Sequence, residues 1–266
     1  MLVHRFAACL AFPALVALHG ETAAPSRAAT PAEASLLMDA LQKTAGDLPR
    51  WAYTETRVLR DEKGKTRSEA VIRYDPSKPY AEQWRPISIN GKAPAPKDLE
   101  KYRKQGERAQ RRDERVERGQ PDSRRTLGEL IDPRTARVVR DDGTRIIFEI
   151  PLRKDGNDRF PPEKFEVLAR IERASGALEN IAVRLRESFR SKLILKVKSG
   201  DGTLDFERVD PKYPATLTAI RGDASASIMF VSVGGELELT RTELKHVKPF
   251  NERFDVQIGT LKAIDF

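Results

Sequence analysis

The chain has 266 residues, of which 48 are Lys or Arg and 40 are Asp or Glu, so its formal net charge is +8. It contains one cysteine, Cys9, and of its three histidines only His246 lies beyond residue 28. A body without cysteine and with one histidine lacks the usual ligands of transition metals and the usual nucleophile and base of hydrolases. The composition therefore predicts a protein that is not an enzyme and holds no metal or cofactor.

Residues 1–28 have the organisation of a secretory signal peptide. His4 and Arg5 give a basic start, residues 6–18 are mostly apolar, and small and polar residues follow. This apolar run is shorter than the roughly 20 residues of a membrane span. We therefore expect cleavage somewhere in residues 20–28, a periplasmic location, and a single-domain body, residues 29–266, that is not an integral membrane protein.

The first part of the body predicts one helix and three strands. Residues 31–47 carry apolar side chains at helical spacing and follow Thr30 and Pro31, which are typical of a helix start. From Trp51 the apolar period changes to two, which predicts a hairpin over residues 51–74 with a turn at residues 61–64. A third strand is expected over residues 82–89, and Asn90-Gly91 favours a left-handed turn after it.

Residues 96–119 predict a charged helix within a helical insertion at about residues 96–132. Its only larger apolar side chains are those of Leu99, Tyr102 and Val116. Three acidic residues each precede a basic residue by four positions, which stabilises an exposed helix: the pairs are Glu100 with Lys104, Glu107 with Arg111, and Glu114 with Arg118. The segment is either a solvated insertion or a surface for an anionic polymer, and the interleaved acids favour the first. A nucleic-acid partner is not expected.

From Arg137 onward, apolar residues alternate with polar residues in one strand after another. Turns are expected between these strands at Asp142-Gly143, Asp155-Gly156-Asn157, Ser175-Gly176, Gly200-Asp201-Gly202, Gly222-Asp223 and Gly234-Gly235. The pattern predicts a mainly β protein: a strongly curved antiparallel sheet that forms an open half β-barrel, with its apolar face inward and a basic face toward water.

This order of elements resembles the periplasmic lipoprotein-carrier superfamily, the LolA/LolB-like proteins. The stretch Tyr74-Asp75-Pro76 and the ending from Gln257 to Phe266 resemble uncharacterised bacterial secreted proteins. The resemblance implies an open β-barrel whose helices cover an apolar cavity, here between the meander and the helix at residues 31–47.

The leading hypothesis is a non-enzymatic periplasmic carrier or envelope sensor that binds an amphiphilic ligand, lipid or acylated. Six side chains are candidates to contact it, with ordinary core packing as the alternative: Trp51, Tyr53, Trp84, Phe148, Phe165 and Leu185. His246 is expected on the surface. Two alternative functions remain, namely a module that binds an anionic envelope polymer through its basic face, and a histidine-independent hydrolase that uses paired carboxylates.

Overall fold

The computed structural model describes residues 26–120, 131–153, 161–191, 195–228 and 231–254. Most of the predicted signal peptide, the turn expected at Asp155-Gly156-Asn157 and the ending from Gln257 lie outside these residues. Ser26, Arg27 and Ala28 lie within them, and β1 (Arg27–Ala28) pairs with β5 at the edge of the sheet. A cleavage before Ser26 would keep this strand in the exported body.

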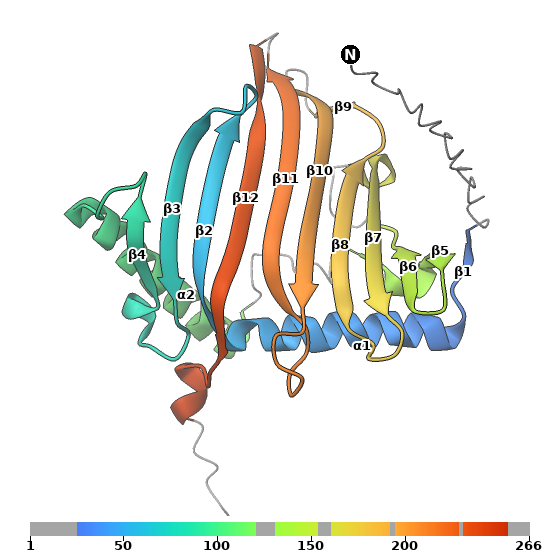
Figure 1. The fold of residues 1–266 in the computed structure, drawn as a ribbon, viewed down its shortest axis with the longest axis horizontal. Coiled ribbons are helices and arrows are strands. Elements are labelled where there is room, and N and C mark those ends of the chain that lie inside the picture. Colours follow the sequence, from blue (N-terminus) through green and yellow to red (C-terminus); the bar gives the residue numbers. More distant parts are fainter. Residues whose placement is uncertain (1–25, 121–130, 154–160, 192–194, 229–230, 255–266) are drawn as a thin grey trace, which may run out of the picture.

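The described chain forms one antiparallel sheet of 12 strands (Figure 1). Along the sheet the strands follow the order β1-β5-β6-β7-β8-β10-β11-β12-β2-β3-β4, and β9 pairs with β10 outside this path. The longer strands are β2 (Trp51–Asp61), β3 (Thr66–Tyr74), β7 (Phe165–Glu172), β8 (Leu178–Leu185), β10 (Leu195–Glu207), β11 (Thr216–Ile228) and β12 (Val231–His246). The shorter ones are β4 (Trp84–Ile89), β5 (Arg137–Asp141), β6 (Arg145–Glu149) and β9 (Phe189–Ser191).

The sheet is open, because β1 and β4 are its two edges and do not pair with each other. The last strand, β12, pairs with β2, so the hairpin β2–β3 continues the meander instead of forming a separate unit. This confirms the predicted fold class: a mainly β protein with an open, curved antiparallel sheet, an N-terminal helix and a second, charged helix. Both helices lie behind the sheet in Figure 1, and we call that side the inner face.

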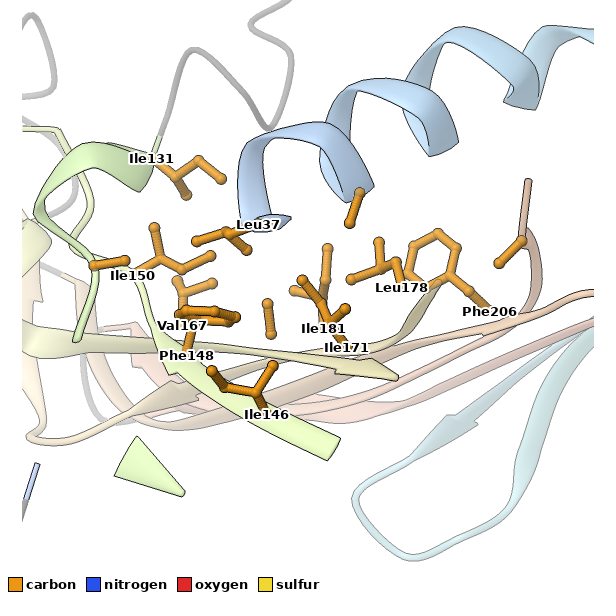
Figure 2. Packing of buried hydrophobic residues seen from close by; sticks show 14 of the residues in the cluster. Leu37, Ile131, Ile146, Phe148, Ile150, Val167, Ile171, Leu178, Ile181 and Phe206 are labelled. Carbon is orange, nitrogen blue, oxygen red and sulfur yellow. The ribbon is translucent and has the colours of Figure 1, made fainter. Parts of the chain in front are cut away.

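Helix α1 (Pro31–Asp47) has the predicted bounds. The Thr30 side chain accepts a hydrogen bond from the Glu33 backbone, and the Glu33 carboxylate accepts one from the Thr30 N–H, which is a capping box. Leu37 and Ala40 face the sheet and are at most 3 % exposed. In Figure 2, Leu37 lies over the side chains of Ile146, Phe148, Ile150 and Val167.

The space between α1 and the sheet is filled by this apolar cluster. Its buried members come from α1, from β5 to β8 and residues next to them, from Ile131, and from the ends of β10 and β11 near α1, and each is at most 7 % exposed. The cavity that the family resemblance implies beneath this helix is therefore occupied by core side chains.

Helix α2 (Pro96–Glu117) covers the other end of the inner face. Tyr102, Gly106 and Ala109 are buried, so the helix is not a solvated insertion on all sides. Gly106 lies so close to the turn Tyr80–Glu82 that a Cβ atom on it would be 1.8 Å from the Tyr80 carbonyl oxygen. Only glycine allows this approach, and the sequence pattern gave no sign of it.

The charged side of α2 carries two of the three predicted pairs. Lys104 lies 3.3 Å from Glu100, and Arg118 lies 3.7 Å from Glu114, whereas Glu107 pairs with Arg103 instead of Arg111. The helix ends at Glu117, and Ile131, at the far end of the predicted insertion, is a buried core residue.

The turns at Asp142-Gly143 and Ser175-Gly176 are confirmed, with φ of +84° at Gly143 and +66° at Gly176. The turns expected at Gly200-Asp201-Gly202, Gly222-Asp223 and Gly234-Gly235 are wrong, because these residues lie inside β10, β11 and β12. The physical reason at Gly235 is a close approach of strands, since a Cβ atom there would lie 2.1 Å from the Arg60 carbonyl oxygen.

Candidate functional site

Two rows of side chains cross the inner face between α1 and the far ends of the long strands. Residues directly opposite each other on paired strands point to the same face of a sheet. The first row runs from β8 to β2 through Val183, Gly202, Gly222, Leu237 and Leu59. The second row, one step closer to α1, runs through Ile181, Leu204, Ile220, Leu239 and Arg57. We call these two rows together the inner trough.

The floor of the inner trough is low because two glycines lie opposite each other. Gly202 on β10 pairs with Gly222 on β11, and neither has a side chain to fill the space above the sheet. A Cβ atom on Gly202 would meet only the Arg221 carbonyl oxygen, at 3.7 Å, and one on Gly200 would meet no described atom within 4 Å, whereas one on Gly222 would lie 3.3 Å from the Asp201 carbonyl oxygen. Among the described residues, the inner face is therefore open over Gly200 and Gly202.

Several apolar side chains of the inner trough are only partly buried. Leu59 is 40 % exposed, and Val183, Leu204, Ile220 and Leu237 are intermediate in burial. On the same face of β7, beneath α1, Val167 and Ala169 are at most 2 % exposed. Beyond the helix, the first row therefore leaves a partly uncovered apolar surface. In the second row, Ile181 and Leu239 are buried. Leu204 and Ile220 of this row, and Val183 of the first row, pack against the edge of the core cluster.

A buried acidic residue lies between two arginines at the β2 end of the inner trough. The Glu55 carboxylate accepts a hydrogen bond from Arg57 Nη2 at 2.7 Å and one from Arg241 Nε at 3.3 Å. The side chain of Glu55 is 8 % exposed and that of Arg57 is 45 % exposed. Two guanidinium groups and one carboxylate leave a local charge of +1. Of the two arginines, Arg57 is the more accessible to solvent.

Three aromatic rings extend from this group toward the β4 edge. The Arg241 guanidinium lies 4.0 Å from the ring centroid of Tyr53, which is a cation–π contact. Tyr53 is 5.1 Å from Tyr74, and Tyr74 is 4.7 Å from Trp84, between ring centroids. Burial raises the pKa of Tyr74 to about 12 and also raises the pKa of Tyr53, so both phenols stay neutral at physiological pH.

Tyr102 of α2 closes this side of the site. Its side chain is 5 % exposed, and burial raises the pKa of its phenol, on which the charges of Arg57 and Glu55 also act. Arg57 therefore lies at the boundary between the helix and the uncovered trough, with an apolar wall on one side and a buried tyrosine on the other.

The six predicted ligand-binding residues do not form one cluster. Phe165 and Leu185 lie opposite each other on β7 and β8, on the inner face next to Val183. Tyr53 lies beneath Arg241, and Trp84 lines a separate hollow of about 410 Å³ at the β4 edge. Trp51 and Phe148 are 2 % and 0 % exposed and belong to the packed interior. The Leu and Gly residues that form the trough were not among the predicted site residues.

His246 is not the surface residue that the sequence predicts. Its side chain is 16 % exposed, and its Nε2 lies 3.0 Å from Asp47 Oδ1 at the end of α1. The Tyr213 ring stacks on its imidazole at 3.6 Å, and Trp51 Nε1 donates to Asp47 at 2.7 Å. These contacts tie the end of α1 to β2 and β12.

Ion pairs occupy part of the outer face, which the sequence predicts to be basic. Glu179 accepts hydrogen bonds from Arg145 at 2.8 Å and from Arg170 at 2.9 Å, in a hollow of about 540 Å³. Elsewhere on this face Arg60 lies 3.1 Å from Glu238. Such exposed pairs contribute little to stability, but they lower the net positive charge that an anionic polymer would meet.

No family model matches this chain, and no curated protein or solved structure does either. None of the helices in the described part of the chain has the length and apolar character needed to cross a membrane. Within the same described ranges, no group of three or more His, Cys, Asp or Glu side chains is placed to hold a metal ion.

Proposed function

We propose that this protein is an exported, non-enzymatic carrier or sensor, of LolA/LolB-like type, that binds an amphiphilic lipid or acylated ligand in the inner trough. The observation that carries the proposal is the partly uncovered apolar row from Val183 to Leu59, with paired glycines in its middle. Soluble proteins seldom leave a continuous apolar strip uncovered unless something binds there.

The position of the trough suits a ligand that must enter and leave. The core beneath α1 is filled, so a ligand there would have to displace the helix, whereas the trough is reached without moving any described element. The predicted signal peptide supports a periplasmic location, where an acylated molecule needs a carrier in order to cross an aqueous space.

Binding of an anionic polymer, the alternative function, has less support. Several arginines of the outer face already pair with acids, namely with Glu149, Glu166, Glu179 and Glu238. A polymer would have to compete with these acids for each guanidinium group.

The test is to fill the trough with a side chain. Gly202→Leu places an isobutyl group over the floor, and the backbone of Gly202 is not in the left-handed conformation that would strain it. Displacing two methylene groups of a bound chain costs about 1.6 kcal/mol, which weakens binding of a fluorescent palmitate analogue by about tenfold or more.

The matched control is Thr203→Leu, one residue along β10 and on the outer face, opposite Arg221. It places the same isobutyl side chain outside the trough and is expected to leave the dissociation constant unchanged. Equal weakening by both variants, or no binding of the probe by the wild-type protein, would reject the proposal. Mass spectrometry of protein purified from its own periplasm, under native conditions, checks independently for copurified lipid.

A further inference from the structure

The charge at one end of the inner trough indicates which amphiphiles it takes. Arg57 is the only charged residue of the second row, and it lies opposite Leu239 of β12 and Ala70 of β3. Its Nη2 is bound to Glu55, and its Nε and Nη1 make no hydrogen bond to any described residue. These donors belong to a side chain that is 45 % exposed, at the end of an apolar strip.

The contacts around Arg57 hold it in place for an anionic group. Glu55 is held from its other side by Arg241, and Arg241 is held by the face of the Tyr53 ring. Arg57 also acts electrostatically on the neutral phenol of Tyr102, as does the acidic Asp98. A guanidinium group with free N–H donors binds carboxylates and phosphates by charge-assisted hydrogen bonds.

The length of the trough fits one long acyl chain. From Arg57 on β2 the trough crosses β12, β11 and β10 to reach Val183 on β8, which is four steps between neighbouring strands. At the usual separation of strands this is about 19 Å, close to the extended length of a long fatty acid. The glycine floor lies toward β8, where the methyl end of the acyl chain would lie.

We infer that the inner trough selects single-chain lipids with an anionic oxygen headgroup, carboxylate or phosphate, which Arg57 binds while the chain runs toward β8. This inference rests on the proposed function and adds the class of headgroup and the direction of the chain.

The experiment compares three ligands of equal chain length on the full-length exported protein: palmitate, hexadecyl phosphate and uncharged hexadecanol, each displacing the same fluorescent probe. The wild-type protein should bind both anions about tenfold or more tightly than hexadecanol, because a charge-assisted hydrogen bond stabilises only the charged headgroups. This comparison needs no variant.

Arg57→Gln should remove this preference, so that palmitate and hexadecyl phosphate bind no more tightly than hexadecanol does. Arg57→Lys keeps the charge and should keep part of the preference. The matched control is Arg60→Gln, on the same strand but on the outer face, where Arg60 pairs with Glu238; it should behave as the wild-type protein does.

Equal affinity of the wild-type protein for palmitate and hexadecanol would overturn the inference, and so would a preference that survives in Arg57→Gln. In both cases binding of the chain, and with it the proposed function, would stand. If none of the three ligands binds, the proposed function itself fails.

Discussion

The inner face of the sheet has two regions with the same alternation of apolar residues, and they differ in whether a helix covers them. On β5 to β8 it carries Val, Ile, Leu and Phe side chains that pack against α1 and are nearly fully buried. On β10 to β12 and β2, beyond α1, it carries Gly202, Gly222, Leu237 and Leu59, which are covered by no described helix. Apolar alternation alone therefore does not define a core. The covering element and the size of the side chains decide whether a face is filled or open.

Truncation in the two regions should have very different costs. Phe148 is 0 % exposed and lies in the cluster beneath α1, so Phe148→Ala should lower the free energy of unfolding by about 3–5 kcal/mol. Leu59 is 40 % exposed, so Leu59→Ala should cost less than about 1 kcal/mol. Urea unfolding followed by circular dichroism measures both.

Similar losses for the two variants would mean that the trough is part of the core, and the distinction between the regions would fail. Leu59→Ala should instead weaken binding of the palmitate probe, because it removes part of the trough wall.

A smaller effect concerns the start of α1, the helix that separates the two regions. The Arg27 guanidinium holds the pKa of Glu33 well below its usual value of 4.5, and Arg173 lies 3.3 Å from the same carboxylate. A carboxylate whose pKa is lowered on folding stabilises the folded state above the unfolded pKa and loses this contribution as pH falls. Glu33→Gln should therefore cost about 1 kcal/mol at pH 7.

The difference between wild type and Glu33→Gln should shrink as the pH falls below about 4.5, because the wild-type carboxylate then begins to be protonated in the unfolded state. Unfolding curves at several pH values measure this. Glu163→Gln, at an exposed position with no described ion pair, serves as the control and should show no such change. A difference that grows toward acid pH would contradict the assignment of Glu33.

Local patterns in the sequence were sufficient for the elements with local causes. Helix α1 was predicted to its ends because Thr30 and Pro31 determine its start within a few residues. The left-handed turn at Asn90-Gly91 was predicted for the same reason, and φ is +50° and +72° there. The alternation of apolar residues identified the antiparallel sheet, because the period of a strand is visible without knowledge of its neighbours.

The candidate site could not be predicted in this way, because it depends on register between distant strands. Gly202 and Gly222 were interpreted as turn residues, since Gly beside Asp is typical of turns, and only pairing across β8, β10, β11 and β12 shows them to be a floor. Asp47 and His246 are 199 residues apart, so no local pattern connects them. Glu55 and Arg241 are 186 residues apart, so no local pattern connects them either.

The most direct test of the account is a crystal structure of the protein with a long fatty acid brominated at its methyl end, located by the anomalous scattering of bromine. A bromine peak is expected on the inner face near Gly202 and Val183, with the carboxylate at Arg57. A peak beneath α1 among Leu37, Ile146 and Ile131, or on the outer face, would contradict it.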